Sequence, residues 1–230
     1  MSKVLKCVVI DCSQIDERRY REILSNVSKE RGSRAESFKS FSDKVMSAVA
    51  GLCMEGLASS FGTKVRKLEN GKPVFERDDM HLSVSHSGGY VAMAWSDGPV
   101  GVDIQRIVPM GNIERRLLTD SECKVLEDRS DRSLTRVWTM KESYLKMTGD
   151  GIAKGLPGLD VLSDESSVLK EDYRFHTFDV SDDVIVTICG RFDPCDAKVQ
   201  SLDMGQFRNA FSPMSSMFSG ISIDMSSEQP

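Results

Sequence analysis

The sequence predicts an α+β fold with antiparallel sheet, and three observations predict it. Several strand-like segments follow one another with only short turns between them. Two longer segments carry apolar residues at near-helical spacing, one before and one after those strands. With 40% hydrophobic and 28% charged residues in 230, the chain can bury the core of one large domain or two small ones. This combination is typical of the α+β class.

The first half predicts a strand, a long helix and a hairpin. Residues 4–10 are rich in β-branched side chains and predict a strand, and residues 37–60 predict an amphipathic helix. A turn is expected at residues 70–73, where glycine and proline lie together. Strands are then expected at residues 81–86 and 90–95, joined by a hairpin turn at Ser87-Gly88-Gly89.

The second half predicts a strand, a helix and two more strands. In the strand expected at residues 100–107, Gly101, Asp103 and Gln105 share one face, opposite the apolar residues between them. Residues 119–122 fit a capping box, a role that accounts for Glu122. A helix is expected from about residue 133 to 147, ended by Gly149, and further strands at about 173–180 and 184–191.

The tail from about residue 197 is rich in Ser, Met and Phe. Phe207, Phe211 and Met214 are spaced to line one face of a short helix. Core packing or disorder is the expected state of this segment, rather than a ligand site.

Charge and composition narrow the function classes. Residues 1–150 carry 24 Lys+Arg against 22 Asp+Glu, whereas residues 151–230 carry 6 against 13. Without a dense basic stripe, nucleic acid is not an expected partner. Nor is a membrane, because no apolar run is long enough to span one. The first residues lack the apolar core of a signal peptide, which predicts a cytoplasmic protein with six reduced cysteines and no zinc site.

Two segments suggest chemistry. Asp103 lies on the less apolar face of its strand, and Gly101 on the same face leaves room for a close approach. In the helix expected at residues 133–147, Trp138, Glu142 and Lys146 are spaced i, i+4 and i+8 and form one ridge beside the apolar stripe. Glu142 and Lys146 therefore flank the buried side of the helix rather than its most exposed face.

Lys141 falls within the apolar stripe of the same helix, which is an unusual place for a lysine. Three explanations stay open at this point. Its ammonium group either reaches solvent along its stem, pairs with a buried carboxylate, or reaches a phosphate group.

Each acidic residue alone has an ordinary structural explanation, since Glu–Lys pairs at i, i+4 are common on solvated helices. Taken together, two carboxylates from separate elements and a nearby lysine suit Mg²⁺ bound to a phosphate ester. Mg²⁺ takes one or two protein carboxylates and leaves the remaining positions to phosphate oxygens and water. The residues alone leave both explanations standing.

Four motifs favour the second explanation. The segments Gly101-Val102-Asp103-Ile104 and Trp138-Thr139-x-Lys141-Glu142-Ser143-Tyr144-x-Lys146 look like the paired signature of 4′-phosphopantetheinyl transferases. Gly71-Lys72-Pro73 and Leu82-Ser83-Val84-Ser85-His86-Ser87 match two further motifs of the surfactin-type subfamily, in the same order. The resemblance covers about residues 65–160; the first 60 residues match loosely and the tail does not match.

The resemblance implies a fold of two similar halves related by a pseudo-twofold, each a small antiparallel sheet with a long helix. The expected divisions are an N-terminal half (1–98) for the nucleotide end of coenzyme A, a C-terminal half (99–196) for the metal and pyrophosphate, and a C-terminal extension (197–230). The chain length fits the monomeric subfamily rather than the short trimeric one.

The resemblance also implies the site. Asp103 and Glu142 would hold Mg²⁺, and Lys146 would contact the pyrophosphate of coenzyme A. Ser85 and His86 would contact the nucleotide end, with His86 at the 3′-phosphate. The adenine side would be lined by Gly71, Lys72 and Pro73, and Lys44 is the candidate for an N-terminal basic group that the family uses at the 3′-phosphate.

Gln105 departs from the family pattern, because many surfactin-type members have an acidic residue there. It shares the face of Asp103, so we expect either its amide oxygen or water to fill that position at the metal, with weaker Mg²⁺ binding as a result.

The implied reaction moves the phosphopantetheine arm of coenzyme A to a serine of an acyl or peptidyl carrier protein and releases 3′,5′-ADP. Asp103, Glu142 and Lys146 would be the catalytic residues, with Glu142 the best candidate for the base. Two alternatives stay open: a non-catalytic module that binds coenzyme A or a carrier protein, which Gln105 suggests, and an Mg²⁺-dependent phosphohydrolase.

Overall fold

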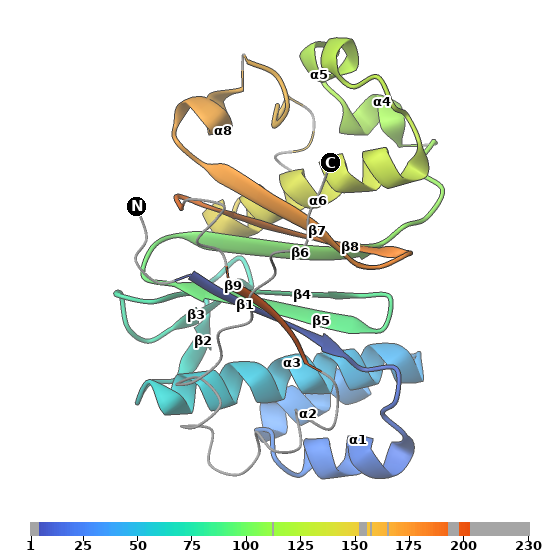
Figure 1. The fold of residues 1–230 in the computed structure, drawn as a ribbon. Coiled ribbons are helices and arrows are strands. Elements are labelled where there is room, and N and C mark those ends of the chain that lie inside the picture. The colour runs from blue at the N-terminus through green and yellow to red at the C-terminus, as the bar shows by residue number, and fades with distance from the viewer. Residues whose placement is uncertain are drawn as a thin grey trace.

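The computed structural model describes residues 5–111, 113–151, 156, 158–164, 166–192 and 198–202. Two main sheets dominate this part of the chain, and the second of them contains the predicted strand that carries Asp103 (Figure 1). The Phe- and Met-containing segment expected at 207–214 and Cys195 lie outside the described residues.

The first sheet has four strands in the order β4-β5-β1-β9 and is covered on one face by a long helix. Short helices precede that helix, and a separate two-stranded sheet follows it. The elements of this part are β1 (Leu5–Asp11), α1 (Glu17–Leu24), α2 (Lys29–Glu36), α3 (Phe41–Ser60), β2 (Val65–Lys67), β3 (Pro73–Phe75), β4 (His81–Ser87), β5 (Tyr90–Ser96) and β9 (Lys198–Leu202).

The second sheet has three antiparallel strands in the order β6-β8-β7, and the other long helix packs on its outer face (Figure 1). That helix, α6, begins after an N-cap serine, Ser130, and ends at Gly149, whose φ of 86° is accessible to glycine at little cost. The elements of this part are β6 (Val100–Arg106), α4 (Glu114–Leu117), α5 (Asp120–Val125), α6 (Asp131–Thr148), α8 (Ser167–Lys170), β7 (Arg174–Ser181) and β8 (Val184–Gly190).

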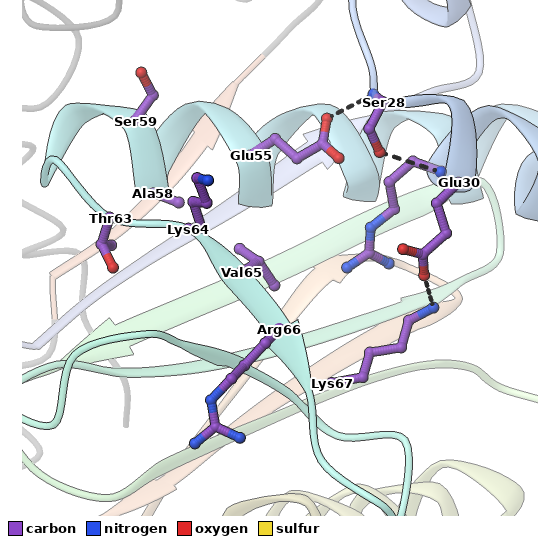
Figure 2. A pocket seen from close by; sticks show the side chains of 11 residues that line it. Ser28, Glu30, Glu55, Ala58, Ser59, Thr63, Lys64, Val65, Arg66 and Lys67 are labelled. Carbon is purple, nitrogen blue, oxygen red and sulfur yellow. Dashed lines mark hydrogen bonds and ion pairs between the residues drawn. The ribbon is translucent and has the colours of Figure 1, made fainter.

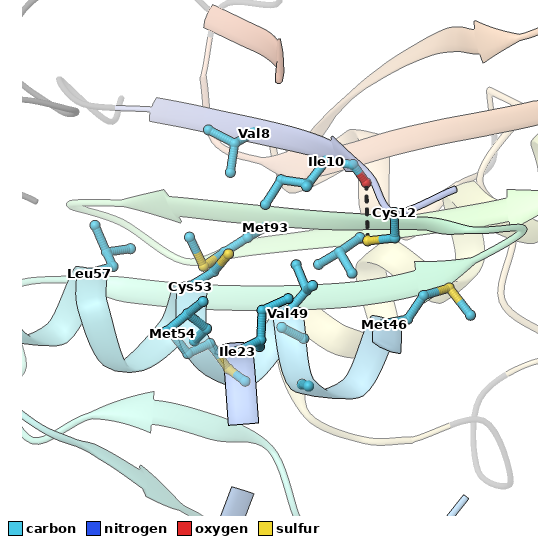
Figure 3. Close-up of a cluster of buried hydrophobic side chains, with 14 of the residues drawn as sticks. Val8, Ile10, Cys12, Ile23, Met46, Val49, Cys53, Met54, Leu57 and Met93 are labelled. Atoms are coloured by element: carbon cyan, nitrogen blue, oxygen red, sulfur yellow. Dashed lines mark hydrogen bonds between the residues drawn. The ribbon is translucent and has the colours of Figure 1, made fainter. Parts of the chain in front are cut away.

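Three apolar clusters hold these layers together. The first lies between α3 and the first sheet, where Val8, Ile10 and Met93 face the helix (Figure 3). The second lies between the two sheets, and the third packs α6 against α4 and the segments that follow α6. Each fully buried aliphatic side chain in these clusters contributes about 1.5–3 kcal/mol through removal from water.

The alternation predicted for residues 100–107 explains how β6 packs against the first sheet with one face and against α6 with the other. Val102 and Ile104 are fully buried against the first sheet, whereas Asp103 lies on the opposite face, under α6. The α+β class, the hairpin and the two long helices are confirmed. One pairing is not antiparallel: β9, within the segment expected to be an extension, pairs in parallel with β1.

Two further observations concern the expected class of protein. In the part of the chain that the structure describes, no helix is long and apolar enough to cross a membrane. Five cysteines there are free thiols, and four of them are buried. Burial raises the pKa of Cys7 and of Cys53 to about 12, so these thiols are inert packing groups at neutral pH.

Candidate active site

The position of α6 on β6 depends on Gly101. A Cβ atom at residue 101 would lie 1.8 Å from the carbonyl oxygen of Ser143 and 2.8 Å from the backbone nitrogen of Met147. The close approach expected at this glycine is therefore made by the helix backbone itself. As a result, Glu142 and Lys146 of α6 lie over the face of β6 that carries Asp103.

Asp103 is 4% exposed, and its two oxygens differ sharply. Oδ1 accepts hydrogen bonds from Ser85 Oγ at 2.8 Å and from Lys146 Nζ at 2.5 Å. Oδ2 is buried and has no hydrogen-bond partner. Buried carboxylate oxygens are rarely left without a partner, so Oδ2 is available for a positively charged ligand.

Glu142 repeats this pattern. It is 5% exposed, and its buried Oε1 atom has no hydrogen-bond partner. Burial, together with the negative charge of Asp103, raises the pKa of Glu142 to about 7, and Lys146 opposes the shift. Lys146 alone does not offset the repulsion between these two neighbouring carboxylates. A divalent cation bound between them would remove that repulsion.

These two orphaned oxygens test whether the site suits Mg²⁺. In the described residues, no group of three or more His, Cys, Asp and Glu side chains is arranged to hold a metal ion. Mg²⁺ does not need one, because it usually takes one or two carboxylates and completes its shell with water and phosphate. Asp103 Oδ2 and Glu142 Oε1 fit that requirement.

Gln105 does not join this pair through any contact in the structure. Its side chain is partly exposed, and its Nε2 atom donates to the backbone carbonyl of Arg106 at 3.2 Å. The side-chain amide of Gln105 is therefore hydrogen-bonded within its own strand and not to Asp103.

A cavity of about 390 Å³ opens beside Glu142 and Lys146. Its wall includes the predicted turn at Gly71, Lys72 and Pro73. The turn is fastened to the end of α6, because Lys72 Nζ donates to the carbonyl of Met147 at 2.5 Å. Burial lowers the pKa of Lys72. The ammonium group of Lys72 thus neutralises the negative end of α6 while the turn borders the cavity.

A second cavity, of about 330 Å³, is markedly basic. It shares Gly71, Pro73, Val84 and Lys146 with the first, so the two cavities adjoin. Its other lining residues include the predicted Ser85 and His86 and three cations that the sequence interpretation missed, Arg31, Arg34 and Lys67. Burial lowers the pKa of His86, and Lys146 and Arg34 lower it further, whereas Asp43 opposes the shift.

Lys44 is not among the residues that line this basic cavity. Its Nζ atom pairs instead with Glu36 Oε2 at 2.9 Å, on the side of α2 and α3. Two basic groups of the cavity come from α2, where Arg31 and Arg34 are three residues apart and therefore share a face. That spacing was the signal in the sequence that could have identified them.

A larger cavity, about 750 Å³, lies between α2, α3 and β2 and shares Arg31 and Lys67 with the basic cavity (Figure 2). Glu55 accepts from the backbone of Ser28, and Glu30 pairs with Lys67 at 2.5 Å across it. Its wall includes neither Asp103 nor Glu142, so size alone does not identify the site of chemistry.

Lys141 does not face any of these cavities. It has no exposed surface, and its Nζ atom donates to Glu122 Oε2 at 2.6 Å and to the carbonyl of Leu117 at 2.5 Å. Of the three explanations for Lys141, pairing with a buried carboxylate is confirmed. Glu122 forms the predicted capping box with Thr119 and also accepts from the backbone of Val161, so it joins α5 to α6 and the loop after α6.

Fold and site together define a class of protein: an α+β protein in which two buried carboxylates, each with an unpartnered oxygen, lie beside a cavity lined by basic side chains. A family model for the 4′-phosphopantetheinyl transferase superfamily matches residues 99–189, which include Asp103 and Glu142. The chain is similar to this superfamily over that segment, and the resemblance drawn from the four motifs is confirmed.

Several relatives of the chain are named 4′-phosphopantetheinyl transferases. The chain is 39% identical over 93 residues to the 4′-phosphopantetheinyl transferase psf-1 of Bacillus pumilus (38% of this chain, 40% of the relative). It is 31% identical over 152 residues to a 4′-phosphopantetheinyl transferase of Bacillus subtilis (60% and 66%). It is 30% identical over 151 residues to the 4′-phosphopantetheinyl transferase gsp of Aneurinibacillus migulanus (61% and 63%). The matches therefore span 40% to 66% of the lengths of these relatives.

Proposed function

We propose that this chain transfers the 4′-phosphopantetheine arm of coenzyme A to a serine of an acyl or peptidyl carrier protein, releases 3′,5′-ADP and depends on Mg²⁺. The observation behind the proposal is the pair of buried, unpartnered oxygens on Asp103 and Glu142. They come from two elements joined by the close contact at Gly101, and a basic cavity lies next to them. The similarity of residues 99–189 to the 4′-phosphopantetheinyl transferase superfamily supports this choice of reaction.

Asp103 and Glu142 are the residues that would hold Mg²⁺, which supplies charge neutralisation at the pyrophosphate when it is bound. We assign Gln105 a minor part at the metal, because a neutral amide oxygen binds Mg²⁺ more weakly than a carboxylate, and its amide nitrogen donates to the carbonyl of Arg106. Lys146 borders both cavities and places an ammonium group beside the carboxylates. We assign it to the pyrophosphate of coenzyme A.

Coenzyme A would lie across the two adjoining cavities. The positive charge of Arg31, Arg34 and Lys67 makes the second cavity the place for the 3′-phosphate, with His86 donating a hydrogen bond there. Arg31 and Arg34 thus replace Lys44 as the N-terminal basic groups. The turn at Gly71 to Pro73 would border the adenine, as the resemblance implies.

In the reaction, the serine hydroxyl of the carrier attacks the β-phosphate, the bond to the 3′,5′-ADP oxygen breaks, and the serine proton must leave. Glu142 is the residue we assign to accept that proton, directly or through a water molecule. Lys146 stabilises the charge that develops on the leaving group. Holding the pyrophosphate between fixed charges supplies much of the remaining rate enhancement.

The finer organisation is part of the same proposal. Two halves, 1–98 and 99–196, would be related by a pseudo-twofold, which the pairing of each main sheet with one long helix supports. Residues 197–230 would form the C-terminal extension, although 198–202 contribute a strand to the first sheet. We expect a cytoplasmic monomer.

The experiment is incubation of the protein with apo carrier protein, coenzyme A and Mg²⁺, followed by mass spectrometry of the carrier. A mass gain of one phosphopantetheine group on the carrier supports transfer. Bound but unchanged coenzyme A would mean a binding module, and cleaved coenzyme A with an unmodified carrier would mean a phosphohydrolase. Apo carrier protein with its acceptor serine changed to alanine is the matched control.

A further inference from the structure

Three serines of β4 share one face and join the two main sheets. Ser83 and Ser87 use their Oγ atoms to accept hydrogen bonds from the backbone amides of Val102 and Arg106, at 3.0 and 3.2 Å. Both bonds reach β6, which belongs to the other sheet. The alternation of serine along β4 therefore supplies hydrogen bonds at a junction between the two sheets.

Ser85, between them, does something different. Its Oγ atom donates to the side chain of Asp103 at 2.8 Å and accepts from Lys146 Nζ at 2.6 Å. Because Lys146 also donates to Asp103 Oδ1 at 2.5 Å, the three side chains form a closed triangle. Ser85 is 7% exposed, so these bonds are shielded from competing water.

A carboxylate oxygen accepts about two hydrogen bonds through its lone pairs. Ser85 and Lys146 together satisfy both acceptor positions of Oδ1. The only oxygen of Asp103 left for another ligand is Oδ2, which is buried and has no partner. The orientation of the carboxylate is thus set from β4, a strand of the other sheet.

We propose that Ser85 is a positioning residue for the metal ligand Asp103, which then binds the divalent cation through Oδ2 alone. This rests on the proposed function and changes the role expected for Ser85, which was contact with the nucleotide. Without the hydroxyl group, Lys146 loses one of its two acceptors and turns fully to Asp103. The carboxylate then rotates toward the lysine, and Oδ2 no longer faces the cation.

The test measures the affinity of Ser85→Ala for Mn²⁺, with free Mn²⁺ detected by electron paramagnetic resonance. The affinity is measured first without coenzyme A and then at saturating coenzyme A. Loss of a residue that orients a metal ligand typically lowers metal affinity about 10- to 100-fold, so we expect at least a roughly tenfold loss in both conditions. Ser87→Ala is the matched control, because it removes a bridging hydroxyl of the same strand that does not touch Asp103. It should leave Mn²⁺ affinity within about twofold of the wild type.

The opposite role predicts the opposite result. If Ser85 only contacts the nucleotide, Ser85→Ala weakens coenzyme A binding in the presence of EDTA and leaves Mn²⁺ affinity unchanged, which overturns the inference. An equal loss in Ser85→Ala and Ser87→Ala also overturns it, since the effect is then general to the sheet junction. Transfer to apo carrier by the wild type is scored separately, so a failed inference and a failed function are distinguishable.

Discussion

Lys141 and Glu122, neither of which has any exposed surface, form an ion pair in which Nζ lies 2.6 Å from Oε2. Removing one member leaves the other charge buried without compensation, which costs about 3–5 kcal/mol. We therefore expect Lys141→Met and Glu122→Gln each to lower the free energy of unfolding by about this amount. The double variant should lose less than the sum, because neither charge is then stranded.

Chemical denaturation of the wild type, the two single variants and the double variant measures this coupling. If the double variant lost the sum of the two single losses in the free energy of unfolding, Lys141 and Glu122 would not be coupled as an ion pair. Because Lys141 contacts Glu122 and Leu117 rather than Asp103 or Glu142, we also expect the double variant to retain Mn²⁺ binding.

Glu142 makes the stability of the metal-free protein depend on pH. Its pKa is about 7 in the folded protein, against an ordinary value of 4.5, so between these values the folded chain holds a proton that the unfolded chain has released. The free energy of unfolding therefore falls as the pH rises from about 4.5 to 7, by up to about 3 kcal/mol. Glu142→Gln removes this loss, so it should stabilise the protein at pH 8 and change little near pH 4.5.

Thermal denaturation in EDTA at the two pH values tests this expectation. Glu17→Gln is the control, because Glu17 lies on the exposed side of α1 with 74% of its side chain accessible. An equal shift of Glu142→Gln at both pH values would show that proton binding at Glu142 is not the cause.

Gly101→Ala should disrupt the site without touching a carboxylate. The new Cβ atom would meet the backbone of α6 at 1.8 Å, and neither backbone can yield cheaply. We expect a loss of about 3 kcal/mol or more in the free energy of unfolding, and transfer activity lost by at least tenfold because Glu142 moves away from Asp103. Gly111→Ala is the control, since nothing lies within 4 Å of a Cβ atom there. Wild-type activity in Gly101→Ala would contradict the claim that the contact between Gly101 and α6 positions Glu142 beside Asp103.

Arg34→Ala should weaken coenzyme A binding through the 3′-phosphate. A lost hydrogen bond to a charged group costs about 1.5–3 kcal/mol, which corresponds to a loss of affinity of at least about tenfold. Calorimetry with coenzyme A and with 3′-dephospho-coenzyme A isolates the contribution of the 3′-phosphate. Arg34→Ala should lower the affinity for coenzyme A and leave the affinity for the 3′-dephospho form unchanged. Lys44→Ala, which removes a lysine paired with Glu36, should affect neither by more than about twofold. The reverse ranking of the two variants would restore Lys44 to the site.

The periodicity of the sequence was enough to predict much of the fold. Residues 81–95 form the expected hairpin, and the capping box at Thr119 begins a helix where it was expected. Asp103 was placed on the less apolar face of its strand and Glu142 beside the apolar stripe of its helix, and the motifs shared with the 4′-phosphopantetheinyl transferases then paired the two residues. The parallel pairing of β9 with β1 could not be predicted, because it joins segments that are far apart in the chain and hydrophobic periodicity reports only local structure.

The same limit explains the residues that were missed. Arg31 and Arg34 lie on a short helix with many charges, where a solvated surface is the ordinary explanation, and only the packing of α2 against α3 brings them to the cavity. Glu122 was fully explained as a cap, and its second role needed the position of Lys141 in space. Lys44 was chosen by its place in the sequence alone, and its contact with Glu36 was not visible there.

The most direct test of the central claim is the mass of an apo carrier protein after incubation with coenzyme A, Mg²⁺ and three forms of the chain: wild type, Asp103→Asn and Glu142→Gln. The account predicts one added phosphopantetheine group with the wild type and almost none with either variant. An unmodified carrier with the wild type, or near-normal modification by both variants, would contradict it.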